Sequence, residues 1–199
     1  HSRYKKTVQT ISYLPHFVST VVVVGMLTNF LSPVGGIVNL MIGKLGGKSI
    51  NFMIKPEWFR PLYIISGIWQ EAGWGSIIYL AALSGIDTQL YEASIVDGAN
   101  KWKQLWHISI PGILPTIIIM LIMNLGHILS IGYEKIILMY NTSTYETADV
   151  INTYVYRRGI LSGEYSFGTA VGLFQSAINF VFVIAANRIS KRVTEVSLW

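Results

Sequence analysis

The sequence predicts an all-α integral membrane protein, and three observations carry this prediction. Of the 199 residues, 52% are hydrophobic and 13% are charged, whereas soluble domains carry about 25% charged residues. The apolar residues gather in four stretches. The lysines and arginines behind the net charge of +5 are scattered in twos and threes, as charges that flank membrane spans are. A soluble enzyme, a disordered tail and a nucleic-acid-binding module are therefore disfavoured, and lipid is the expected environment.

Four stretches are long enough and apolar enough to cross a bilayer, which takes about 20 mainly apolar residues. They are residues 14–31, 62–84, 112–131 and 167–187. The glycine-rich connector between the first two contains an apolar piece, residues 37–42, that is too short to span. We expect this connector and residues 132–166 to form extracytoplasmic loops, the first of them packed on other subunits.

The charges near the predicted spans bear on the orientation of the chain. If the spans alternate in direction, three segments share one side of the membrane: residues 1–13, 85–111 and 188–199. These segments hold eight of the 15 lysines and arginines, so the count alone does not decide the orientation. Arg188, Lys191 and Arg192 directly follow the last span, which places both termini in the cytoplasm. Arg60 and Lys135 favour the opposite orientation.

The segment between the second and third spans carries two helix-start signals. Asp87 or Thr88 can cap a helix through Val96, because their side-chain oxygens accept hydrogen bonds from the first free backbone N–H groups. Gly98 follows the end of this helix, where a positive φ costs glycine little. Asn100 can cap a second helix that leads toward the third span.

Apolar side chains recur at three- and four-residue steps along these two helices, so a cytoplasmic segment presents an apolar stripe. Its members are Ile95, Ala99, Trp102, Leu105 and Trp106. The stripe packs either on the chain's own spans or on another protein, and one side of the helix pair can serve each purpose. Pro111 then opens the third span at a position that proline tolerates.

The same segment carries a spaced pattern. It reads Glu92-Ala93-Ser94, two residues, Asp97-Gly98-Ala99, eight residues, Ile108, one residue, Ile110-Pro111. The pattern resembles the EAA loop of inner-membrane permease subunits of binding-protein-dependent ABC importers, which reads E-A-A, two residues, D-G-A, eight residues, I-x-L-P. Ser94 and Ile110 are conservative departures from it. Residues 79–83 and several positions within 148–159 resemble the oligosaccharide branch of these permeases, which is related to the maltose permeases.

The resemblance implies a type I ABC importer transmembrane domain with six spans in the full subunit. Four are visible, and residue 1 is His and not Met, so we expect residues 1–199 to be a fragment without the first spans. In the family, residues 85–111 would form the cytoplasmic coupling loop, docked in a groove of the nucleotide-binding subunit where Glu92 pairs with a cation. The residues implied for ATPase coupling are Glu92, Ala93, Ser94, Asp97, Gly98, Ala99 and Trp102.

The resemblance also implies partners and a location. A second homologous permease, nucleotide-binding ATPase subunits and an extracellular solute-binding protein would assemble with this chain in the bacterial plasma membrane. The chain itself would be non-catalytic and bind no cofactor, because ATP and Mg²⁺ belong to the ATPase subunits. The implied substrate is an oligosaccharide.

Polar residues at membrane depth are the candidates for the substrate path, since such groups usually face a cavity or a partner. A sugar site needs hydrogen-bonding groups for hydroxyls and aromatic faces for the CH side of the ring. Carried over from maltose-type permeases by offset from the EAA loop, the contacts fall on Glu71, Trp74, Asn124 and Ile128. Gln175 and Asn179, one turn apart on the last span, are further candidates. Hydrogen bonding between spans or subunits is the alternative role for these polar side chains.

Two other functions stay open. An importer of peptides, amino acids or phosphate would share the EAA pattern, and an intramembrane enzyme using Glu71 with His127 is the alternative from another class. Residues 46–49 resemble the end of a phosphate-binding loop, but Ile42 stands where its first glycine is needed. No His, Asp or Glu joins His127 at a metal-ligand spacing. We therefore expect neither a nucleotide site nor a metal site.

Overall fold

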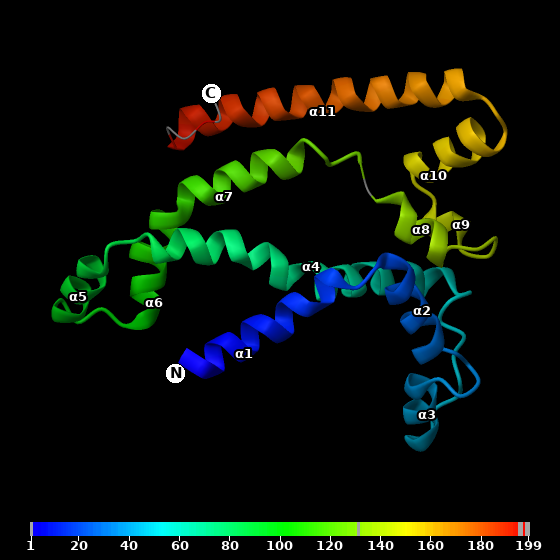
Figure 1. The fold of residues 1–199 in the computed structure, drawn as a ribbon, viewed down its shortest axis with the longest axis horizontal. Helices are drawn as coiled ribbons and strands as arrows, with labels where there is room; N and C mark the ends of the chain where they lie inside the picture. Colours follow the sequence, from blue (N-terminus) through cyan, green and yellow to red (C-terminus); the bar gives the residue numbers. More distant parts are fainter. Residues whose placement is uncertain (1, 131, 195–196, 198–199) are drawn as a thin grey trace. The chain divides into compact units, whose positions relative to one another are not determined.

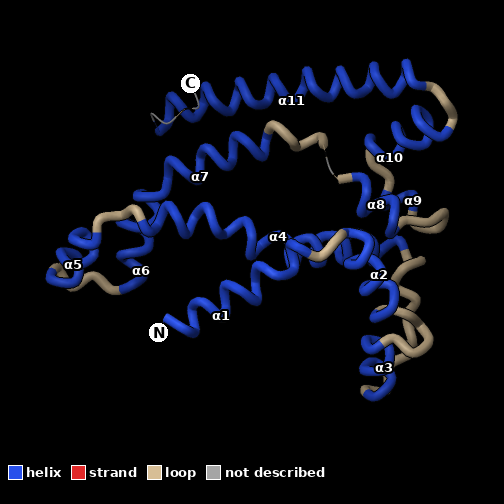
Figure 2. The backbone as a smooth tube through the Cα atoms, in the orientation of Figure 1, coloured by secondary structure: helices blue, strands red, loops and turns tan. Residues whose placement is uncertain are grey.

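The structure is a computed structural model that describes residues 2–130, 132–194 and 197, and every regular element in that part of the chain is a helix (Figure 1, Figure 2). This confirms the all-α prediction. In chain order the elements are α1 (Ser2–Tyr13), η1 (Leu14–Phe17), α2 (Thr20–Phe30), α3 (Ile37–Lys44), α4 (Pro56–Ser84), α5 (Thr88–Val96), α6 (Lys101–Gln104), η2 (Leu105–Ser109), α7 (Ile110–Leu125), α8 (Tyr133–Met139), α9 (Tyr145–Ala148), α10 (Ile151–Val155), η3 (Tyr156–Leu161) and α11 (Tyr165–Thr194).

The chain divides into two compact units, each of which has its own internal packing. The first comprises His1–Trp74 and Ser130–Gly172, and the second comprises Gly75–Leu129 and Leu173–Trp199. The first unit therefore contains both expected extracytoplasmic loops. The second contains the segment with the EAA pattern.

The stretch expected to span the membrane over residues 14–31 is not one continuous helix. The helix over Arg3–Phe17 and the helix α2 are bent relative to each other by 98°. Val18 is extended at this break, and the Ser19 side chain accepts a hydrogen bond from the Val22 N–H. Ser19 is therefore the cap of a new helix inside the apolar run.

Helix α4 holds this break in place. The Gln70 side-chain amide donates a hydrogen bond of 2.9 Å to the carbonyl of Val18. Gly73 lies directly against α1, because a Cβ at Gly73 would collide with the backbone carbonyl of Ser12. A polar side chain and a small residue on α4 thus let the broken helix approach closely and keep its backbone hydrogen-bonded.

The expected spans correspond to helices that differ in apolarity. By length and apolarity, two helices in the described part of the chain qualify as spans, Lys101–Leu125 and Tyr165–Arg192, and the bent pair is a third if it counts as one span. The span expected over residues 62–84 lies within α4. This helix has 29 residues but does not qualify, because Gln70, Glu71 and several glycines lower its apolarity.

The third span begins and ends earlier than expected. α6 continues through the π-helical turn η2 directly into α7, which makes Lys101–Leu125 one continuous helix. Pro111 stands in the first turn of α7, as expected, but it does not begin the continuous helix. The Ile110 N–H bonds to the Leu105 carbonyl five residues back. Pro111 has no backbone N–H, and this wider turn lets the helix continue without the hydrogen bond that such a group would make. Residue 131, the expected end of the span, lies outside the described residues.

The expected loop over residues 132–166 folds into α8, α9, α10 and η3. Helices α8 and α9 pack with α2 and the start of α4 around an apolar core made of Val24, Phe59, Ile136, Met139 and Ala148. The Arg157 guanidinium donates two hydrogen bonds, of 2.9 and 2.7 Å, to the carboxylate of Asp149. Hydrogen bonding to Arg157 holds the pKa of Asp149 below its ordinary value. The loop is therefore an ordered part of the first unit.

One buried side chain, that of Asn39, joins the start of the connector between α2 and α4 to its later part by hydrogen bonds. The Asn39 amide nitrogen lies 3.1, 2.9 and 2.9 Å from the carbonyl oxygens of Leu31, Ser32 and Ile50. Its side-chain oxygen accepts a hydrogen bond of 2.8 Å from the Ile50 N–H. Asn39 belongs to the short helix α3, which contains the apolar piece that was expected not to span.

Gly73→Val is expected to destabilise the protein by about 2 kcal/mol or more, because the new side chain would collide with the backbone of Ser12. The thermal unfolding midpoint of the detergent-purified transporter measures this effect. Gly75→Val in the same helix is the matched control, since nothing lies within 4 Å of a Cβ at Gly75. Equal loss of stability in both variants would contradict the close approach of α1 and α4.

Candidate functional site

The segment over residues 85–111 contains the two capped helices that the sequence predicts. Of the two candidate caps, Asp87 is the one used: its carboxylate accepts a hydrogen bond of 2.9 Å from the Gln89 N–H. Gly98 has a φ of +71° just after α5, a conformation that strains residues with a Cβ. Asn100 caps α6 in the same way as Asp87 caps α5. The predicted caps and turn are confirmed.

Side-chain hydrogen bonds join α5 to the helix that follows it. The Ser94 hydroxyl accepts a hydrogen bond of 2.9 Å from the Gln104 amide and donates one of 2.7 Å to the Tyr91 carbonyl. The hydroxyl oxygens of Tyr91 and Ser109 lie 3.0 Å apart. Ser94, which departs from the E-A-A pattern, therefore stabilises the angle between the two helices.

The apolar stripe on this segment is largely exposed. Ile95 and Trp102 keep 64% and 70% of their surface accessible, and Trp106 is exposed as well. Val96, at the end of α5, is 88% exposed, whereas Ala99 is half-buried. Such a surface fits docking to another protein better than packing on helices of its own unit.

Charged residues of the pattern lie beside this stripe. Glu92 is exposed on α5. Asp97 and Lys103 line a groove of about 420 Å³ together with His107. The segment therefore presents both signs of charge next to exposed apolar side chains.

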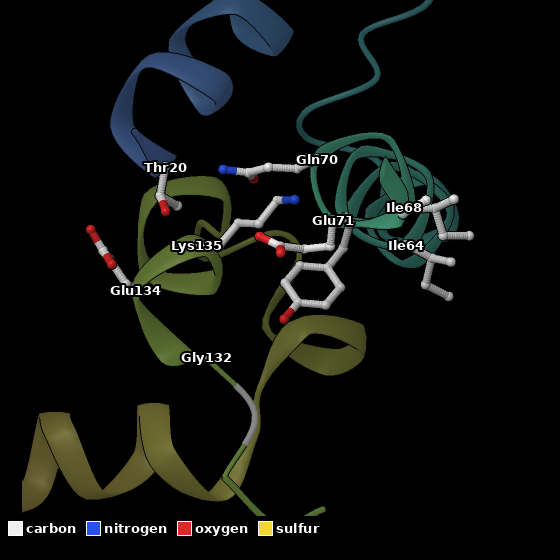
Figure 3. A pocket seen from close by; sticks show the side chains of 11 residues that line it. Thr20, Ile64, Ile68, Gln70, Glu71, Gly132, Glu134 and Lys135 are labelled. Carbon is white, nitrogen blue, oxygen red and sulfur yellow. The ribbon is translucent and has the colours of Figure 1, made fainter. Parts of the chain in front are cut away.

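A second candidate site is a cavity of about 760 Å³ in the first unit (Figure 3). This volume lies within the range of about 300–1,000 Å³ found for small-molecule sites. α2, α4 and the start of α8 form its walls. Its polar and aromatic lining residues are Thr20, Tyr63, Gln70, Glu71, Glu134 and Lys135. Hydrogen-bonding groups and an aromatic face thus converge, as binding of a sugar requires.

Among the residues expected on the substrate path, Glu71 lines this cavity. Its Oε2 lies 3.0 Å from Nδ1 of His16. The His16 ring stacks on Trp74, with ring centroids 4.4 Å apart. The structure therefore brings Glu71 and Trp74 together through His16, and it gives Glu71 a histidine neighbour other than His127.

The other expected path residues belong to the second unit. Asn124 donates a hydrogen bond of 2.9 Å to a carbonyl of its own helix, and Ile128 lies in the turn after α7. Gln175 of α11 donates to the Leu129 carbonyl, in the turn after α7, at 3.3 Å. Asn179 is half-buried one turn further along α11. A role for these four residues in the substrate path stays a prediction.

The sequence does not assign Thr20, Tyr63, Gln70, Glu134 or Lys135 to the cavity. Lys135 is the charged residue among them that is buried. Because Lys135 is a cation in an expected loop, the sequence predicts that it is exposed to solvent, yet its side chain is buried. Residues 136–139, which follow it, are all apolar. A lone cation at the head of an apolar helix is therefore the one available signal. Figure 3 shows its side chain extending from α8 toward Gln70 and Glu71 of α4.

Comparison with known proteins identifies the class. The family described as binding-protein-dependent transport system inner membrane component matches residues 2–195, and the chain belongs to this family. A bacterial alginate ABC transporter, solved in complex with an alginate pentasaccharide-bound periplasmic protein, contains a chain that is 49% identical, with a TM-score of 0.95. The match covers 99% of this chain and 68% of that one. The fold is therefore that of a type I ABC importer permease.

Two curated relatives come from Bacillus subtilis (strain 168). The polygalacturonan/rhamnogalacturonan transport system permease protein YteP is 45% identical over 98% of this chain, and protein LplB is 42% identical over 98%. The chain spans 61% of the length of the first and 62% of the length of the second.

Ser94→Ala is expected to loosen the packing of α5 on α6 by about 1 kcal/mol, because the Gln104 amide loses its acceptor. Tryptic cleavage after Lys101 and Lys103 in the folded transporter should then become about fivefold faster. Ser84→Ala is the control, since the Ser84 hydroxyl bonds to Ala81 of its own helix. An unchanged cleavage rate in Ser94→Ala would show that this hydrogen bond does not hold the segment together.

Proposed function

We propose that this chain is part of a permease subunit of an ATP-driven oligosaccharide importer. The observation that carries the proposal is the exposed apolar surface on the segment with the EAA pattern, between α4 and α7. A cytoplasmic segment that exposes Val96 and Trp102 requires a protein partner. A groove in a nucleotide-binding subunit is that partner, and Glu92 pairs there with a cation.

In this proposal the chain does no chemistry of its own. ATP and Mg²⁺ bind to the nucleotide-binding subunits, whose closure displaces the coupling segment. Because η2 joins α6 to α7 without a break, the displacement passes directly into a membrane-spanning helix. A second, homologous permease completes the path, an extracellular binding protein delivers the sugar, and a cavity in this path opens to each side of the membrane in turn.

We place the coupling segment and both ends of the chain on the cytoplasmic side. Lys101 and Lys103 lie on the coupling segment, and Arg188 and Arg192 lie in the last turns of α11. Cations close to the ends of spans favour the cytoplasmic side. Residues 132–166 then face the outside, where the binding protein docks.

The relatives and the cavity both support a sugar as the substrate. YteP is named for polygalacturonan and rhamnogalacturonan, and a solved relative is described as importing the acidic polysaccharide alginate. The cavity offers Glu71 as an acceptor for hydroxyl groups and Tyr63 as an aromatic face. We therefore propose oligosaccharides, acidic ones included, as the substrate class.

Val96→Asp is expected to reduce both the recovery of ATPase subunits with the permease and sugar uptake by about tenfold or more, because it puts a charge into a desolvated interface. Co-purification and uptake of labelled oligosaccharide in a strain that lacks the native gene measure the two effects.

Val34→Asp is the matched control for this change. Val34 is 86% exposed, close to the 88% of Val96, but it lies in the connector after α2. We expect Val34→Asp to leave the recovery of ATPase subunits unchanged. Normal assembly and uptake by Val96→Asp would refute the coupling role.

The complete transporter is expected to take up oligosaccharides but not peptides, amino acids or phosphate. Reconstituted with its binding protein, it should show ATP hydrolysis stimulated by loaded binding protein only when the solute is a sugar. The measurement is ATPase activity and uptake across a panel of the four solute classes. Stimulation by one of the other classes, with none by sugars, would establish a different type of importer.

A further inference from the structure

Lys135 is a buried cation that lacks a hydrogen-bond partner within the part of the chain that the structure describes. Its side chain is 9% exposed, and Nζ is buried without an acceptor in hydrogen-bond range. Burying an ammonium group is strongly unfavourable unless an acceptor or a negative charge compensates for the lost water. The side chain also borders the cavity of about 760 Å³. A ligand in the cavity can therefore reach it.

The neighbouring protein groups do not supply the missing acceptor. The centroid of the Tyr63 ring lies 5.4 Å from Nζ, at cation–π distance. Gly67 of α4 leaves the space open, since a Cβ there would lie 3.9 Å from Nζ. The Glu71 carboxylate acts on Lys135 through its charge but has its contact with His16. No ion pair among the described residues includes Lys135.

The electrostatics of Lys135 agree with this geometry. Burial lowers the pKa of Lys135, and the negative charge of Glu71 opposes that effect only in part. An anion bound at Nζ would favour the charged form of the side chain. A negatively charged ligand in the cavity would therefore compensate for the buried positive charge of Lys135.

We infer that Lys135 recognises the carboxylate of an acidic oligosaccharide in this cavity and so makes the importer selective for negatively charged sugars. Glu71 and Glu134 can accept hydrogen bonds from sugar hydroxyls, and the Tyr63 ring can pack on the CH face. A sugar with a carboxylate uses all of these groups. A neutral sugar offers Lys135 hydroxyl oxygens but no negative charge, and a simple anion leaves the acceptors unused. The inference rests on the sugar import proposed above.

The test uses two labelled probes, a uronate oligosaccharide and its carboxyl-reduced, neutral counterpart. Their Kd values are measured on the detergent-purified complex of the permease pair and the ATPase subunits. The native complex is expected to bind the acidic probe at least about tenfold more tightly, as a charge-assisted hydrogen bond allows. Lys135→Gln should remove this preference by weakening the acidic probe alone, and Lys135→Arg should retain it.

Lys55→Gln is the matched control, because Lys55 is an exposed lysine that pairs with Glu57 at 3.8 Å. It should leave both Kd values unchanged. Equal weakening of both probes by Lys135→Gln would show a structural role only, and an unchanged preference would remove Lys135 from recognition. Either result overturns the inference.

A second variant keeps the proposal testable if Lys135→Gln fails to assemble. Glu71→Gln removes a negative charge near Lys135, so it should lower the Kd of the acidic probe relative to that of the neutral probe. A ratio that stays the same or moves the other way contradicts the inference. Equal binding of both probes by the native complex overturns selectivity while sugar import stands, whereas import of another solute class and binding of neither probe refutes the proposed function itself.

Discussion

The first unit depends on one constraint, that backbone polar groups at membrane depth must find hydrogen bonds within the protein. A helix that breaks at Val18 and Ser19 would otherwise present such groups to lipid. The Ser19 hydroxyl and the Gln70 amide bond to backbone groups at the break, and Gly73 allows the necessary approach of α4. The cavity lies at this same break, because Thr20, the first residue of α2, forms part of its wall. The candidate substrate site therefore lies where side chains complete the backbone hydrogen bonds of the broken helix.

In the second unit, a proline within a continuous helix leaves one backbone hydrogen bond unmade, and a π-helical turn adjusts to it. Pro111 lacks a backbone N–H, and the π-helical turn before it accommodates this loss without ending the helix. The result is one helix of 25 residues, Lys101–Leu125, about 38 Å long at 1.5 Å per residue. Its first turn carries the exposed Trp102, and its later turns are apolar enough to span a membrane. One continuous element thus contains both the exposed Trp102 and a stretch apolar enough to span a membrane.

Local signals in the sequence predict those elements that local chemistry determines. Asp87, Gly98 and Asn100 mark the ends of α5 and α6 correctly, because caps and positive φ depend on residues a few positions apart. Ser19 carries a similar signal, but the apolar run around it favours one unbroken span. Lys135 could not be assigned to the cavity, since its burial depends on packing between α4 and α8, which are far apart in the sequence. The EAA pattern predicts the family, whereas the lining of the cavity requires tertiary structure.

In the connector between α2 and α4, several backbone groups bond to one side chain, that of Asn39, and this affects how the connector opens. Leu31, Ser32 and Ile50 all bond to the same buried amide, so displacement of the Asn39 side chain breaks all of these hydrogen bonds at once. Such contacts open together and not one at a time. We therefore expect residues 31–50 to open as one cooperative unit, without the frequent fraying typical of a glycine-rich loop.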